Sequence, residues 1–121
     1  MKLHRCTVPK TIYHKRDDTI TIDYEKGYII EQSQFDFDIY VQKSGYNWLL
    51  NIGGTLAMRY KTLKDLRYSA LSDLNAKISG NKKVISEIKW ALKRLEFLEK
   101  NNGYANRDSI YKLRDEFEEE N

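Results

Sequence analysis

The clearest chemical signal in the sequence is a cationic and aromatic stretch at residues 81–101. At 100° per residue, Trp90 and Phe97 fall on one line of a helix, nearly opposite the aliphatic stripe of the same segment. Lysine and arginine side chains surround this line. Aromatic and arginine side chains are enriched at the hot spots of protein interfaces. The pattern therefore predicts a partner-binding line, made of Trp90, Phe97, Lys93, Arg94, Lys89 and Lys83.

Two other interpretations of this stretch stay open. In the first, Trp90 and Phe97 pack on a third helix that follows Asn106, and its acidic side chains cover the lysines. In the second, the cations bind phosphates while the rings stack on unpaired bases. A nucleic-acid surface would use the basic helix 81–101 or a three-stranded meander at 35–60. The cations predicted for this alternative are Arg59, Lys61, Lys64, Arg67, Lys82 and Lys100.

Charge is distributed unevenly along the chain. Residues 1–58 carry seven basic and seven acidic side chains, residues 59–100 carry eleven and five, and residues 101–121 carry three and six. A basic element therefore lies between a neutral half and an acidic tail. The tail carboxylates come at the C-terminus of a helix, where the helix dipole disfavours them. Two interpretations of the acidic tail stay open: its last turn is solvated and frayed, or the tail lies near the basic helix and screens it.

The other reactive side chains form no recognisable metal or catalytic motif. The soft metal ligands are His4, Cys6 and His14, which are too few for a tetrahedral site. A local group of carboxylates suits turns and the outer face of a strand: Asp17, Asp18, Asp23 and Glu25. The sequence contains neither a glycine-rich phosphate loop nor a nucleophile elbow. We therefore predict a protein that is not an enzyme and that holds no metal or cofactor.

The first half of the chain has the residue alternation of strands. Residues 35–42 alternate apolar and polar side chains, and tight turns at 44–45 and 53–54 separate them from two further strands. A three-stranded antiparallel meander is predicted over 35–60, and a hairpin within 11–32 adds to it. The side chains predicted to face outward are Asp36, Asp38, Tyr40, Gln42, Asn47, Leu49, Asn51, Ala57 and Arg59.

The second half has the periodicity of helices. Thr62, Asn81 and Asn106 each stand where a helix N-cap belongs. We predict an α+β fold with about five antiparallel strands, then an antiparallel helical pair and a short C-terminal helix. The chain forms one domain, β-rich over 1–60 and helical over 61–121. The predicted core consists of Phe35, Phe37, Ile39, Val41, Leu66, Leu74, Ile88, Leu92 and Leu95.

Three strands are predicted before the first helix. The short motif Tyr60, Lys61 and Thr62, an aromatic residue followed by Lys and Thr, leads from the third strand into this helix. Over residues 35–78 this arrangement resembles the arm-type DNA-binding domain of phage and transposon tyrosine integrases. The resemblance implies that the sheet face docks into the major groove. The chain departs from the pattern at Asp36 and Asp38, because carboxylates there would face phosphates.

Length and composition complete the functional expectation. A single cysteine favours a cytoplasmic location, and no apolar run is long enough to span a membrane. The Lys-, Tyr- and Asn-rich composition resembles small accessory proteins of low-GC Gram-positive bacteriophages and mobile elements. We therefore expect a non-catalytic inhibitor or anti-defence protein that docks on a host protein, or on a phage protein. Nucleic-acid binding is the alternative, and a homodimer through the partner-binding line is a further expectation.

Overall fold

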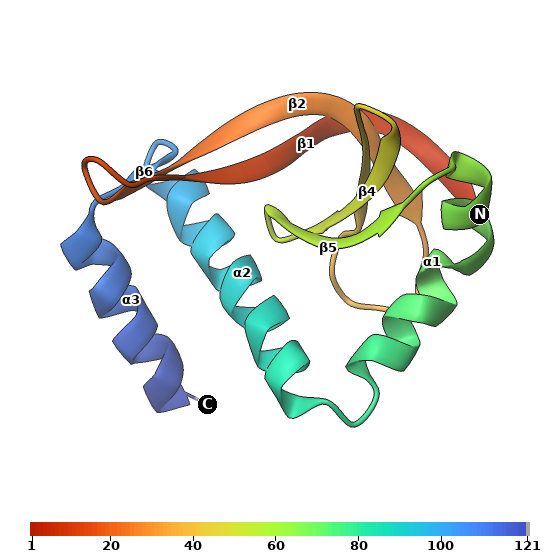
Figure 1. The fold of residues 1–121 in the computed structure, drawn as a ribbon. Helices are drawn as coiled ribbons and strands as arrows, with labels where there is room; N and C mark the ends of the chain where they lie inside the picture. Colours follow the sequence, from red (N-terminus) through yellow and green to blue (C-terminus); the bar gives the residue numbers. More distant parts are fainter. Residues whose placement is uncertain (121) are drawn as a thin grey trace.

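A computed structural model describes residues 1–120 and confirms the α+β fold (Figure 1). The strands are β1 (Lys2–His14), β2 (Thr19–Glu31), β3 (Tyr40–Ser44), β4 (Asn47–Ile52), β5 (Thr55–Tyr60) and β6 (Tyr104–Ala105). The helices are α1 (Leu63–Ile78), α2 (Lys82–Lys100) and α3 (Arg107–Glu120). The antiparallel sheet has the order β1-β2-β3-β4-β5, and β6 pairs with β2.

The long β1–β2 hairpin is the most extended feature of the fold. It arches over β4 and β5, while α1 and α2 lie on the opposite side of these strands (Figure 1). The first strand begins at Lys2, so the predicted hairpin within 11–32 was too short. Pro9 lies within β1, which is an edge strand of the sheet. Edge strands tolerate proline because its missing N–H need not serve the ladder.

The predicted strand at 35–42 begins only at Tyr40. In the segment before Tyr40, the side chain of Gln32 forms hydrogen bonds with the backbone of Phe35 and Phe37. Its Nε2 donates to the carbonyls of Phe35 and Phe37 at 3.3 and 3.1 Å, and its Oε1 accepts from the Phe35 N–H at 2.8 Å. The two phenyl rings stack at a centroid distance of 5.3 Å. Three backbone groups of Phe35 and Phe37 therefore have hydrogen-bond partners without a neighbouring strand.

The outer face of the meander is partly covered, which corrects the predicted exposure of Gln42 and Asn51. Gln42 is 6% exposed and Asn51 is 5% exposed. The β1–β2 hairpin folds onto this face, and the approach is close at Gly27. A Cβ atom there would lie 2.6 Å from Cγ2 of Val8 and 3.1 Å from Cγ of Gln42. Only glycine leaves room for this contact.

The three predicted N-caps are confirmed. Thr62 accepts a hydrogen bond from the Asp65 N–H at 3.0 Å, and Asn81 accepts one from Val84 at 3.2 Å. The Asn106 side chain accepts from the Ser109 N–H at 2.9 Å. The helices α1 and α2 run in opposite directions and diverge in a V from their short connection (Figure 1).

The core lies between the sheet and the two longer helices. Five residues of the predicted core are buried: Ile39, Val41, Leu66, Leu74 and Leu95. The other four are partly exposed, and they pack against the cluster of buried side chains: Phe35, Phe37, Ile88 and Leu92. A smaller cluster joins Ile20, Leu98 and Ala105. Among residues 1–120, no helix combines the length and apolar character that a membrane span requires.

Candidate functional site

The partner-binding line lies along the contact between α2 and α3. Trp90 is half-buried, and its ring lies 5.5 Å from that of Phe117 on α3. The guanidinium of Arg114 stacks over the same indole at 4.8 Å. Phe97 is also half-buried and packs on the cluster around Leu98. For Trp90, this is the packing on the third helix that one of the interpretations expected. Binding of a partner through the line stays a prediction.

The cations of this line have different surroundings. Lys93 forms an ion pair with Glu120 at 2.8 Å, so the acidic tail contacts the basic helix. Arg94 donates to Oγ1 of Thr11 at 3.3 Å, and its Nε is buried without a hydrogen-bond partner among the described residues. Burial lowers the pKa of the Arg94 guanidinium. Lys83 and Lys89 are exposed.

The cations predicted for nucleic acid do not form one patch. Lys82 and Lys100 are at opposite ends of α2, about 27 Å apart along the helix axis. Lys100 is also paired with Glu96 at 2.7 Å, and Arg67 donates to the Met1 carbonyl at 2.7 Å. Arg59, Lys61 and Lys64 are exposed near the start of α1. The structure therefore divides this predicted set between separate places.

A different set of cations gathers beside the β3–β4 hairpin. Arg5, Lys26 and Lys43 line a cleft of about 510 Å³ together with Tyr28 and Trp48. Cys6 and Gly27 complete the lining, which contains no acidic side chain within residues 1–120. We call this feature the cationic cleft. It combines three positive charges with two aromatic rings.

The strand register explains why these five side chains meet. Arg5 lies opposite Tyr28, Tyr28 lies opposite Val41, and Lys43 lies opposite Trp48. Directly opposed residues of an antiparallel ladder share one face, and every second residue along a strand returns to it. The Lys43 ammonium lies 5.9 Å from the centroid of the Trp48 ring. The cationic cleft therefore continues the sheet face that carries the core.

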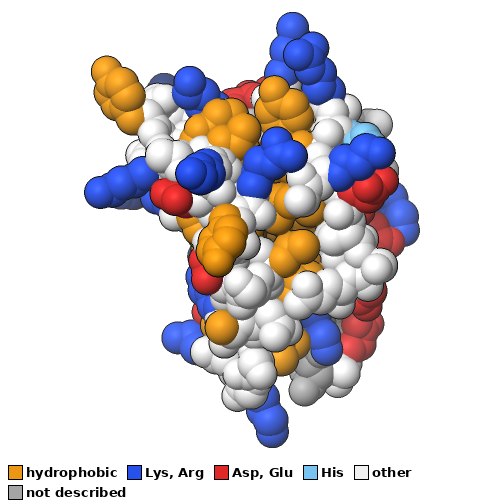
Figure 2. Space-filling view, turned by 90° about the vertical axis from the view of Figure 1, so that its right-hand side faces the viewer, with side chains coloured by type: hydrophobic (Ala, Val, Ile, Leu, Met, Phe, Trp, Pro, Cys, Tyr) orange, Lys and Arg blue, Asp and Glu red, His pale blue; other side chains and the backbone are white. Residues whose placement is uncertain are grey.

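Figure 2 shows how charged and hydrophobic side chains are arranged on one face of the protein. On the face seen in Figure 2, lysine and arginine side chains surround exposed hydrophobic ones, while acidic side chains lie mainly along one edge.

Within the cationic cleft, the pKa of the Cys6 thiol is raised by burial and, to a smaller extent, by the negative charge of Asp38. The thiol is therefore protonated at neutral pH and is a poor nucleophile.

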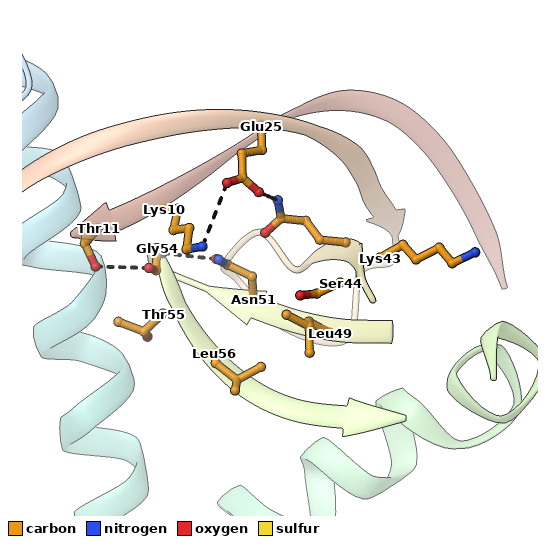
Figure 3. A pocket seen from close by; sticks show the side chains of 11 residues that line it. Lys10, Thr11, Glu25, Lys43, Ser44, Leu49, Asn51, Gly54, Thr55 and Leu56 are labelled. Atoms are coloured by element: carbon orange, nitrogen blue, oxygen red, sulfur yellow. Dashed lines mark hydrogen bonds and ion pairs between the residues drawn. The ribbon is translucent and has the colours of Figure 1, made fainter. Parts of the chain in front are cut away.

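A second concavity, of about 380 Å³, lies on the other face of the β3–β4 hairpin (Figure 3). We call it the polar pocket. The Gln42 side chain donates to Glu25 at 2.8 Å, and Lys10 lies 3.8 Å from the same carboxylate. Leu49 and Leu56 contribute an apolar wall. Lys43 lines this pocket as well, but its ammonium points away from it in Figure 3.

The predicted soft ligands and carboxylates are used separately. His4 contacts Glu31 at 3.3 Å, and His14 contacts Thr21 at 2.7 Å. Asp18 accepts a hydrogen bond from Tyr13 and pairs with Arg107 on α3. Within residues 1–120, no three His, Cys, Asp or Glu side chains gather where they would hold a metal ion.

The cationic cleft was missed in the sequence because its cations are isolated along the chain. Each comes from a different strand and has no lysine or arginine within two residues of it. The only local signal for the cationic cleft is that a cation, Lys43, and an aromatic ring, Trp48, flank one short turn. A scan of protein-family models, a search of curated proteins and a search of solved structures each found no match for this chain.

Proposed function

We propose that the protein is a non-catalytic binding protein whose cationic cleft binds nucleic acid. The observation that carries this proposal is the lining of the cleft, where Arg5, Lys26 and Lys43 surround aromatic rings without an acidic neighbour in the lining. Cations bind phosphates and release condensed counterions, while aromatic rings stack on bases. The proposal keeps the ligand of the sequence alternative but not its surface: the meander 35–60 supplies only Lys43 and Trp48, and β1 and β2 supply the rest of the lining.

The test is fluorescence anisotropy of a labelled single-stranded oligonucleotide over a range of salt concentrations. Lys43→Glu should weaken binding by about tenfold or more and should lower the slope of log K against log salt by roughly 0.7 per lost phosphate contact. Lys15→Glu is the matched control, because Lys15 is an exposed lysine between β1 and β2. If both variants lost the same affinity, the loss would come from the change in net charge. That result would contradict a site at the cleft.

Docking on a host or phage protein is the second candidate function, with the inhibitory role expected of a bacteriophage accessory protein. It is favoured by Trp90 and Phe97, which stay partly accessible beside exposed Lys89. A pulldown from host lysate, with and without nuclease, separates a protein partner from one bridged by nucleic acid. Trp90→Ala should reduce capture of the nuclease-resistant partner while the helix content is retained. Loss of the folded state would instead assign Trp90 to the core.

A further inference from the structure

The cationic cleft and the polar pocket lie on the two faces of one hairpin. Lys43 lines both concavities, since its strand separates them. The hairpin turn consists of Gly45 and Tyr46, because Ser44 pairs directly with Asn47. Tyr46 is 96% exposed at this tip, three residues after Lys43, so a ligand that passes around the tip would meet its ring. The ring therefore contributes little to the packing of the protein.

The charges of the two concavities suit different parts of one ligand. The cationic cleft offers three cations, and so it suits phosphates. In the polar pocket, Glu25 is paired with Lys10 and accepts from Gln42, so an additional phosphate there would face a carboxylate. An uncharged base fits the pocket better, because Leu49 and Leu56 offer apolar contact beside polar groups.

We propose that both concavities form one track for an extended single strand, with Tyr46 stacking a base where the strand crosses the hairpin tip. This inference rests on the proposed nucleic-acid function and specifies its ligand. A duplex does not fit the track, because its bases are paired and because it is stiff over roughly 150 base pairs. A single strand is flexible enough to turn around the tip of the hairpin and to place different nucleotides on its two faces.

The test compares single strands of two lengths on the full chain. An oligodeoxythymidine of about twelve nucleotides should bind at least tenfold more tightly than one of about three, since single-strand sites span roughly 4–16 nucleotides. A duplex of the longer length should bind at least about tenfold more weakly than the single strand, because its bases are inaccessible for stacking. Equal affinity for the short and the long strand would overturn the track.

Tyr46→Ala should weaken binding of the longer strand by about 5- to 150-fold, the range expected for one lost base stack. Tyr46→Phe should restore the affinity because it keeps the ring. Tyr68→Ala is the matched control, since Tyr68 is 92% exposed on α1. Equal behaviour of the Tyr46→Ala and Tyr68→Ala proteins would overturn the role of Tyr46.

These outcomes separate the two proposals. If Lys43→Glu abolishes binding while length and Tyr46→Ala have no effect, the cationic cleft binds nucleic acid and the track is wrong. If no single strand or duplex binds at low salt, both the proposed function and the track are wrong. Far-UV circular dichroism of each variant checks that it is folded.

Discussion

Lys43 and Trp48 face each other across the β3–β4 ladder, with the Lys43 ammonium 5.9 Å from the centroid of the indole ring. A phosphate held by this ammonium would bring the attached nucleotide close to the ring. The pair thus places a cation and a stacking surface together on a rigid strand pair. Sites built on strands hold their geometry better than sites built on loops.

The first prediction concerns the ring of Trp48. Trp48→Leu should weaken single-strand binding by about 5- to 150-fold, because leucine fills part of the space but offers no π-face. Trp48→Phe should keep most of the affinity. Anisotropy titrations measure both variants. Equal affinity of the leucine and phenylalanine variants would show that stacking is not part of binding.

The second prediction concerns Gly53, whose turn presses against α2. A Cβ atom there would lie 2.8 Å from the Ala91 carbonyl carbon and 2.8 Å from the Leu92 nitrogen, and φ is 61°. Gly53→Ala should lower the free energy of unfolding by about 3 kcal/mol, from backbone strain and forced separation of the turn from the helix.

Gly80→Ala is the control for this prediction, because Gly80 has a similar φ of 69° and a Cβ atom there would meet no other atom within 4 Å. Gly80→Ala should lower the free energy of unfolding by only about 1 to 2 kcal/mol, because only backbone strain contributes. Urea denaturation measures both variants. Equal losses would mean that the contact with α2 contributes nothing.

The third prediction concerns the attachment of α3. Phe117 is 4% exposed and contacts Trp90, so Phe117→Ala should lower the free energy of unfolding by about 3 kcal/mol or more. In a Trp48→Phe background, the emission of Trp90 should shift to longer wavelength as water reaches the indole. Glu119→Ala is the control, because Glu119 is exposed on the same helix. An unchanged spectrum for the Phe117→Ala protein would contradict the packing.

The fourth prediction concerns Arg94, a guanidinium whose Nε is buried without a hydrogen-bond partner among the described residues. Desolvation of an unpaired charge is unfavourable, and one hydrogen bond to Thr11 offsets it only in part. Arg94→Met should therefore leave the free energy of unfolding unchanged or raise it by about 1 kcal/mol. Denaturant titration tests this, and a loss of several kcal/mol would show that the guanidinium is well paired.

The fifth prediction is a loss of stability at alkaline pH. Burial and a hydrogen bond to Asp73 raise the pKa of Tyr60 to about 12. The unfolded chain has a tyrosine pKa of about 10, so the folded state holds its proton more tightly. This contribution is complete below pH of about 10 and is lost as the pH rises toward 12.

Tyr60→Phe should therefore reduce the decline in stability between pH of about 10 and 12, as measured by denaturant titration at each pH. Tyr40, whose pKa is also raised to about 12, keeps its own contribution in this variant. Tyr68→Phe should leave the decline unchanged, because Tyr68 is 92% exposed. The same decline in all three proteins would argue against a proton held at Tyr60.

The helix caps were predictable because their signals are local. Thr62, Asn81 and Asn106 each bond a backbone N–H three residues later, and such a motif is complete within four residues. The start of β1 was not predicted, because Pro9 and several charged residues interrupt its alternation. Its pairing with β2 supplies the order that the local sequence lacks.

The candidate site was harder to predict, because it depends on contacts between distant residues. Gln42 is polar and follows the alternation of an outer face, yet Gly27 lets the β1–β2 hairpin cover it. Arg5, Lys26 and Lys43 are scattered in sequence and meet only through the register of three strands. The charged helix was predicted instead, because its lysines are neighbours along the chain.

The edge strand β1 is partly closed by the chain itself. Asn51 donates to the Pro9 carbonyl at 3.2 Å, and the Thr11 N–H donates to the Gly54 carbonyl at 3.0 Å, both on the side away from β2. Exposed edges recruit strands from other molecules and begin aggregation. The middle of β1 is a weaker template, because the Pro9 carbonyl and the Thr11 N–H already have partners and Pro9 has no N–H. The protein should therefore resist strand-to-strand assembly along this edge even when it is highly concentrated.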